Sequence, residues 1–206
     1  QVAVEALGRR FLPIACDLVE ADVAGLQTVV DRVVTALGGL DVLVNNAGTI
    51  RRAPALEFSQ QDWDEVMQVN LRSLFFLSQA AARHMAAHGG GKIIHVASVL
   101  SFQGGITVPS YTAAKSGVAG LTRAMANEWA RLDINVNAIA PGYMVTDNTA
   151  PLRADPERSQ AILARIPAGA WGEPADLKGA VVFLASAASR YMHGAIVSVD
   201  GGWLAR

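Results

Sequence analysis

Apolar runs of strand length alternate with long helical patterns in this chain, and this alternation constrains the fold more than any other feature. The segments 41–46 (DVLVNN), 92–98 (KIIHVAS) and 134–141 (INVNAIAP) carry apolar residues at adjacent positions, which is typical of strands buried on both faces. Helical patterns at 60–88 and 111–131 lie between them. The sequence therefore predicts a doubly wound α/β fold, a parallel sheet with helices on both faces.

Shorter patterns extend this plan. The other predicted elements are a strand at 11–15, a helix at 22–37 ended by Gly38, a helix at 156–166 capped by Asp155, a helix at 173–189 and a strand at 195–202. No linker, repeat or shift in composition interrupts the chain, so we expect one domain over residues 1–206.

Composition excludes several classes of partner. A net charge of −1 over 206 residues gives no electrostatic attraction to nucleic acid or to an anionic membrane surface. No apolar run approaches the ~20 residues that a membrane-spanning helix needs. The single cysteine, Cys16, allows no internal disulfide and fits a reducing compartment. We therefore expect a cytoplasmic protein with no nucleic-acid or membrane partner.

Small and polar residues follow each predicted strand of the sheet. CDL (16–18), NNAG (45–48), ASV (97–99) and APGYMVT (140–146) stand where strands end. Ligands of parallel sheets bind beyond the carboxyl ends of the strands, so these segments predict one shared crevice. NNAG is also compatible with an ordinary turn, because Asn and Gly are common turn residues.

Tyr111 and Lys115 lie four residues apart in a predicted helix that starts near Pro109, so they share a face. A nearby ammonium group and the helix N-terminus both favour phenolate, and they predict a pKa of Tyr111 below its ordinary value. Such a tyrosine could exchange a proton with a carbonyl or alcohol oxygen. An isolated pair of this kind is more commonly an ordinary surface pair.

Ser98 and Asn70 are the other polar candidates. Ser98 ends a predicted strand and could bond the same substrate oxygen as Tyr111, whereas no G-x-S-x-G motif supports a role as hydrolase nucleophile. Asn70 is either a solvated side chain or an amide that holds a water beside Lys115. His84 and His88 lack a third ligand, so we expect no metal site.

With NNAG, Asn70, Ser98 and the Tyr111–Lys115 pair in this order, the chain resembles the short-chain dehydrogenase/reductases over its whole length. The resemblance implies a Rossmann-like fold and hydride transfer between a nicotinamide cofactor and a carbonyl or secondary alcohol. It implies that Tyr111 is the acid/base, that Lys115 lowers its pKa and holds the nicotinamide ribose, that Ser98 orients the substrate oxygen, and that Asn70 anchors a water.

The resemblance also implies the cofactor site, with NAD as the expected cofactor, NADP as the alternative, and a homotetramer. Besides Tyr111 and Lys115, the implied cofactor residues are Asp17, Leu18, Asn45, Ala47, Gly48, Pro141, Gly142, Met144 and Thr146. Two positions depart from the family. No strand with a glycine-rich turn and helix precedes residue 11, so this N-terminal element is expected to be missing from the chain, and Ala170 stands where an arginine is expected.

Within the family, the loop segments 45–59 and 137–155 are similar to those of dehydrogenases that act on deoxy or keto sugar acids. A sugar acid carries a carboxylate, for which the loop residues Arg51, Arg52, Gln103 and Arg153 are candidate partners. Three alternatives stay open at this point: a 3-oxoacyl thioester reductase, a polyol dehydrogenase, and a dinucleotide-binding protein without catalytic activity.

Overall fold

A computed structural model describes residues 1–206 and contains a four-stranded parallel sheet in the order β1-β2-β3-β4. The strands are β1 (Val42–Asn45), β2 (Gly91–Val96), β3 (Ile134–Pro141) and β4 (Ile196–Val199). Because all four run in the same direction, their carboxyl ends lie at one edge of the sheet. The predicted α/β fold is confirmed, and the single domain stays a prediction.

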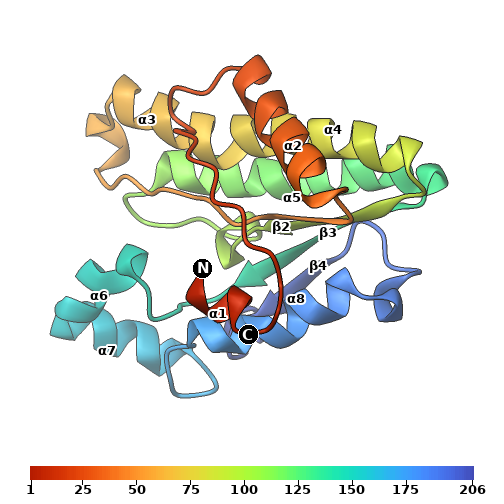
Figure 1. The fold of residues 1–206 in the computed structure, drawn as a ribbon. Helices are drawn as coiled ribbons and strands as arrows, with labels where there is room; N and C mark the ends of the chain where they lie inside the picture. Colours follow the sequence, from red (N-terminus) through yellow and green to blue (C-terminus); the bar gives the residue numbers. More distant parts are fainter.

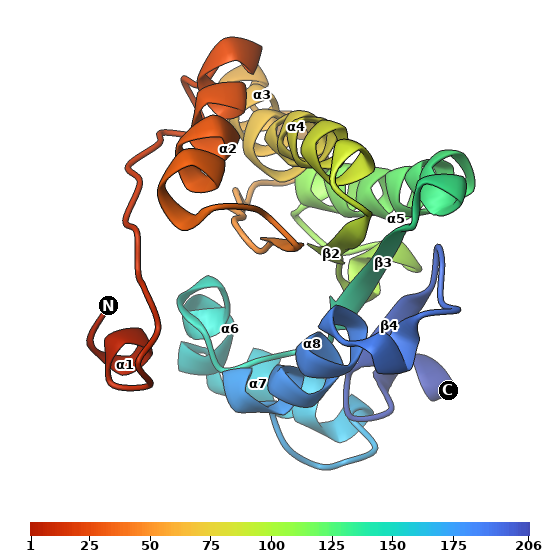
Figure 2. The same ribbon diagram turned by 45° about the vertical axis from the view of Figure 1, so that its right-hand side comes forward.

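Helices cover both faces of this sheet (Figure 1, Figure 2). One layer consists of α2 (Val23–Leu37), α3 (Gln60–Met67), α4 (Ser73–Ala87) and α5 (Pro109–Trp129). On the other side lies α8 (Lys178–Ala185), with α6 (Ala150–Ala154) and α7 (Pro156–Arg165) beside it. Ile93 and Ile94 are adjacent on β2 and enter different core clusters, the first with Met85 and the second with Leu184. This alternation is why β2 is apolar at successive positions.

Polar caps fix several helix ends where the sequence predicts them. The side chain of Asp22 accepts a hydrogen bond from the Gly25 N–H (2.7 Å), and Gly38 ends α2 with φ 93°. Asp155 likewise caps α7 by accepting from the Arg158 N–H (3.0 Å). A left-handed residue after the last turn favours glycine, which explains the stop at Gly38.

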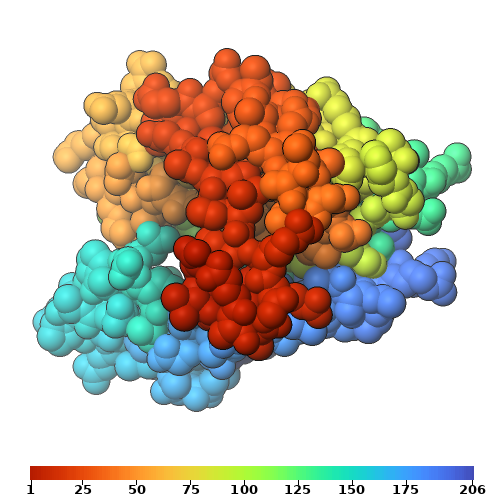
Figure 3. All heavy atoms as spheres, viewed as in Figure 1, coloured from red at the N-terminus to blue at the C-terminus, as the bar shows by residue number.

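The predicted strand at 11–15 is wrong. After the short helix α1 (Val2–Glu5), residues 9–17 are extended but pair with no strand among residues 1–206. An extended segment becomes a strand only when a neighbouring strand takes its peptide hydrogen bonds. Arg10 instead donates to the carbonyl oxygens of Ala36 (2.9 Å) and Leu37 (2.5 Å) at the end of α2. Figure 3 shows the N-terminal residues lying across the molecule between the two helical layers.

None of the helices has both the length and the apolar character needed to cross a membrane.

Candidate active site

A cavity of about 440 Å³ opens beyond the carboxyl ends of β2 and β3. Ser98, which follows β2, and Tyr111, on the first turn of α5, both line it. Gly142 lines it from the segment after β3. Two of the predicted strand-end segments, 97–99 and 140–146, therefore meet at this cavity, whereas no residue of 16–18 or 45–48 lines it.

Tyr111 and Lys115 share a face of α5, as the spacing predicts. The Lys115 Nζ lies 5.5 Å from the centroid of the Tyr111 ring and donates a hydrogen bond to the Val96 carbonyl oxygen (2.6 Å). Lys115 is only 4% exposed, and burial lowers the pKa of its ammonium group to about 8. A lysine with this pKa is still largely charged at neutral pH, where it can stabilise a phenolate.

The direction expected for the pKa of Tyr111 is not observed. Burial raises the pKa of the Tyr111 phenol, while the Ser98 hydroxyl and the Arg52 guanidinium lower it to a smaller extent. Burial disfavours phenolate because the anion loses its hydration. The phenol of this structure is therefore protonated at neutral pH and can donate its proton to a carbonyl oxygen.

Ser98 is held by its own backbone segment. It is 7% exposed, and its Oγ accepts a hydrogen bond from the Leu100 N–H (3.1 Å). A serine hydroxyl that accepts one bond keeps its proton free to donate. Ser98 can therefore donate to an oxygen atom placed between itself and Tyr111.

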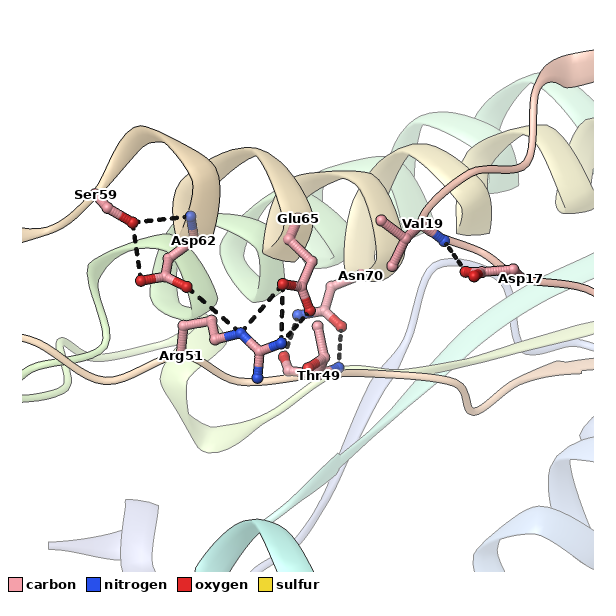
Figure 4. A network of polar contacts seen from close by, with 8 residues as sticks. All are labelled: Asp17, Val19, Thr49, Arg51, Ser59, Asp62, Glu65 and Asn70. Carbon is pink, nitrogen blue, oxygen red and sulfur yellow. Dashed lines mark hydrogen bonds and ion pairs between the residues drawn. The ribbon is translucent and has the colours of Figure 1, made fainter.

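Asn70 is buried, not solvated. The predicted helix at 60–88 changes into a π-helical segment at Gln68–Arg72, between α3 and α4. There Asn70, 1% exposed, donates to the Thr49 carbonyl oxygen (2.7 Å) and accepts from the Thr49 N–H (2.8 Å) (Figure 4). Insertions of this type are common at functional sites. Both ends of the amide are thus occupied in fixing the loop after β1.

A buried polar network lies beneath the site, and the sequence analysis missed it. The His95 Nε2 lies 3.2 Å from the Ser78 Oγ, and its Nδ1 lies 3.0 Å from the Thr122 Oγ1. Asn45 donates to the same Ser78 hydroxyl (2.9 Å). Burial, with a smaller contribution from the charge of Lys115, lowers the pKa of His95 to about 3. The sequence feature that could have indicated this network is the histidine within the apolar run 92–98.

The segment after β1 contains three of the implied cofactor residues. Asn45 is buried at the end of the strand, and Ala47 and Gly48 are exposed. A Cβ at Gly48 would lie 3.1 Å from the Asn70 Oδ1 and 3.9 Å from the Lys115 Nζ. Glycine therefore lets this backbone pass close to both side chains without displacing Asn70.

The other implied cofactor residues lie at the ends of neighbouring segments. The Asp17 carboxylate accepts from the Val19 N–H (2.9 Å) (Figure 4), and the Leu18 carbonyl oxygen accepts from Ser73 (3.1 Å). After β3, a Cβ at Gly142 would lie 2.6 Å from the Asp200 Cα, so close packing explains this glycine. The remaining three are the half-buried Pro141, the buried Met144 and the exposed Thr146.

Three of the four substrate candidates do not line the cavity. Arg51 is ion-paired with Glu65 (2.6 Å) and points toward α3 (Figure 4). Arg153 donates to the Thr146 carbonyl oxygen (3.1 Å), and Gln103 accepts from Arg165 (3.1 Å). The residues that could bind a substrate lie elsewhere on the cavity wall.

Two arginines line the cavity. Arg52 donates to the Asn148 carbonyl oxygen (2.6 Å) and was one of the four candidates. Arg158, on α7, was missed. The sequence could have indicated it, because Arg158 is a basic residue in the first turn of a predicted helix, where it opposes the helix dipole. Asn148 and Thr149 add polar groups to the same wall, and no Asp or Glu belongs to it.

Comparison with known proteins supports the resemblance. A family model described as enoyl-(acyl carrier protein) reductase matches residues 1–204. The chain is 64% identical over 204 residues to the 2-dehydro-3-deoxy-D-gluconate 5-dehydrogenase of Escherichia coli (strain K12), a match that covers 98% of this chain and 80% of that protein. The protein of the same name from Dickeya dadantii (strain 3937) is 59% identical over the same shares of the two chains.

Solved structures agree with this grouping. An Agrobacterium tumefaciens protein assigned as a 2-deoxy-D-gluconate 3-dehydrogenase, with bound NADP, is 62% identical with a TM-score of 0.84 over 90% of this chain and 75% of that chain. A Beutenbergia cavernae protein assigned as an NAD(P)-dependent gluconate 5-dehydrogenase, also with bound NADP, is 49% identical with a TM-score of 0.94 over 100% of this chain and 81% of that chain. The chain belongs to the short-chain dehydrogenase/reductase family of NAD(P)-dependent oxidoreductases.

Proposed function

We propose that this protein transfers a hydride between a nicotinamide cofactor and a secondary alcohol or ketone of a deoxy or keto sugar acid, of the 2-deoxy-D-gluconate or 2-dehydro-3-deoxy-D-gluconate type. One observation carries the proposal. The cavity wall combines Ser98 and Tyr111 with two arginines and no acidic side chain. A cavity lined by one sign of charge favours a substrate of the opposite sign. The names of the similar proteins support the same substrate class.

In this proposal the chain itself handles the proton. Tyr111 donates its proton to the carbonyl oxygen during reduction and takes it back during oxidation, while Ser98 donates a hydrogen bond to the same oxygen. The ammonium group of Lys115 stabilises the phenolate left behind, and the Val96 carbonyl oxygen holds that ammonium in place. A nicotinamide, when bound, supplies or accepts the hydride at the carbon.

The residues after β1 fit such a cofactor. The exposed backbone of Ala47 and Gly48, with no side chain beyond Cβ, allows a flat ring or a ribose to approach Lys115. Asn45 would support this segment, Asp17 and Leu18 would border the adenine, and Pro141, Gly142, Met144 and Thr146 would flank the nicotinamide. We propose NAD as the cofactor. Turnover supported by NADP alone would contradict this choice, and two solved relatives with bound NADP make NADP the necessary comparison.

The test is a substrate panel. The intact protein is assayed by the absorbance of the reduced nicotinamide, with NAD and with NADP, against keto sugar acids, neutral polyols and a 3-oxoacyl thioester. The proposal expects the highest kcat/KM for a sugar acid. A preference for the thioester or for a polyol would replace it. Cofactor binding without turnover of any substrate would favour a binding protein.

We also propose a homotetramer in the cytoplasm. A groove of about 980 Å³ lies between residues 19–22 and the helices α3, α4 and α5. Half of its lining residues are apolar, among them the half-buried Leu71, Phe75, Phe76 and Leu121, and the other half are polar or charged. Contact with a second copy would bury these side chains. Light scattering at several protein concentrations tests the assembly, and a monomer at all of them would contradict it.

A further inference from the structure

Arg158 is a half-buried arginine on the cavity wall without a partner. The neighbouring arginines are all engaged: Arg51 binds Glu65, Arg52 binds the Asn148 carbonyl oxygen, and Arg153 binds the Thr146 carbonyl oxygen. The Arg158 guanidinium makes no hydrogen bond or ion pair with any residue of the chain; only its backbone N–H is bonded, to Asp155. Five N–H donors in a partly buried position are therefore free.

The packing of α7 turns Arg158 toward the site. Ile162 lies one turn later on the same helix face, is 2% exposed, and packs in a cluster with Val99, Ile166 and Trp203. Val99 directly follows Ser98 in the chain. The face that carries Ile162 thus presents Arg158 at the side of the cavity formed by the segment after β2.

Helix stability does not explain an arginine at this position. Arg158 stands in the first turn of α7, where the positive end of the helix dipole opposes a cation. No acidic side chain lines the cavity to neutralise it, and Asn148 and Thr149 contribute only uncharged groups. A bound anionic ligand would neutralise this cation and accept hydrogen bonds from its free N–H donors.

We infer that Arg158 binds the substrate carboxylate and so selects sugar acids over neutral sugars of the same length. The inference rests on the proposed function and names the residue that sets its substrate class. The division of roles follows from the two arginines. Arg52 is the one that lowers the pKa of Tyr111, and it is already bonded to the loop at Asn148, so it belongs to the reacting end. Arg158 keeps the planar pair of donors that a carboxylate accepts at the other end of the substrate.

The test compares 2-dehydro-3-deoxy-D-gluconate with the primary amide of the same acid, using the intact protein and saturating cofactor. Arg158→Met should raise the KM for the acid by about 10- to 100-fold, because a hydrogen-bonded charge pair is lost. The kcat for the acid should stay within about threefold, and the KM for the amide should hardly change. Arg158→Lys, which keeps the charge but not the planar pair of donors, should have a KM for the acid between those of the parent and of Arg158→Met.

Arg32→Met is the matched control, since Arg32 is an exposed and unpaired arginine on α2, outside the cavity, and should leave both KM values unchanged. Cofactor binding, followed by nicotinamide fluorescence, shows that each variant is folded. An unchanged KM for the acid in Arg158→Met, or an equal rise for acid and amide, would overturn the assignment of Arg158. A parent protein that turns over acid and amide equally well would instead overturn the sugar-acid function itself.

Discussion

The buried layer beneath the cavity and the wall of the cavity are built in opposite ways. This buried layer, called the floor here, consists of Asn70, His95 and Lys115, none of which lines the cavity itself. They are 1%, 0% and 4% exposed, each with a hydrogen bond to another residue of the chain. The wall, defined as Arg52, Asn148 and Arg158, is exposed or half-buried, and the Arg158 guanidinium has no partner. Fixed polar groups preorganise chemistry, whereas free donors await a ligand. The floor therefore fits the proton transfer and the wall fits substrate choice.

Tyr111 lies where the floor meets the wall, and its removal has the largest expected effect. Tyr111→Phe deletes the hydroxyl that exchanges the proton and keeps the ring beside Lys115. Because general acid–base catalysis contributes about 10²- to 10⁴-fold, kcat should fall by that factor while cofactor affinity stays. Steady-state kinetics and nicotinamide fluorescence measure the two quantities.

Tyr143→Phe is the matched control, since Tyr143 lines the same cavity but packs against Trp171 and Trp203. Its kcat should change by less than about tenfold. The catalytic assignment fails if Tyr111→Phe keeps a kcat within tenfold of the parent.

The buried imidazole of the floor should make the protein sensitive to acid. The pKa of His95 is about 3 in the folded protein, against an ordinary value of 6.5. Below pH 6.5 the unfolded chain binds a proton that the folded chain does not, so His95 lowers the free energy of unfolding as the pH falls toward 3. The loss between pH 6.5 and 4.5 should be about 2 kcal/mol. His95→Gln, which can still bond Ser78 and Thr122, should abolish this part of the pH dependence.

Urea unfolding at several pH values measures the effect as a difference between the parent and His95→Gln. His88→Gln, which removes an exposed imidazole at the end of α4, is the matched control. Parallel curves for the parent and His95→Gln from pH 7 to 4.5 would show that His95 is not held neutral by burial.

Sequence periodicity predicted most of the layered fold but not the details of the floor. The apolar runs predicted the strands of the sheet, and the i, i+4 spacing predicted that Tyr111 and Lys115 share a face. The π-helical segment was not predictable from the local helical pattern, and Asn70 within it bonds to Thr49, which is 21 residues away in the chain. The raised pKa of Tyr111 was also not predicted from the sequence, because burial is a property of the assembled fold and not of a local motif.

The wall shows the same limit. The cap at Asp155 predicted α7, but only the packing of Ile162 against Val99 shows which face of this helix turns to the cavity. Charge alone named Arg51, Arg52 and Arg153 as candidates. In the structure only Arg52 of these three lines the cavity. Arg51 is bonded to a side chain distant in sequence, and Arg52 and Arg153 are bonded to main-chain oxygens. A loop arginine can therefore be recognised from sequence as a candidate, whereas its availability depends on tertiary contacts.

Changing the amide of Asn70 to a carboxylate should destabilise the folded protein. Asn70→Asp replaces the N–H donor to the Thr49 carbonyl oxygen with a buried carboxylate oxygen, so two acceptors face each other. The free energy of unfolding should fall by about 2–3 kcal/mol. Asn148→Asp makes the same change on the exposed wall, where only the main-chain oxygen of Asn148 is bonded, and should alter it by less than about 0.5 kcal/mol. Equal effects in the two variants would remove the contrast between floor and wall.

The smallest expected effect is at Arg51, a loop arginine next to Arg52 in the chain that does not line the cavity. Its ion pair with Glu65 joins side chains that are 44% and 20% exposed, so Arg51→Met should lower the free energy of unfolding by only about 0.5–1 kcal/mol. The loss should shrink in high salt, because exposed charges are screened. The KM for a sugar acid should stay within about twofold, since this guanidinium is occupied on α3, outside the cavity. A tenfold rise in that KM would mean that Arg51 leaves Glu65 to bind substrate, and the wall would then extend to the loop after β1.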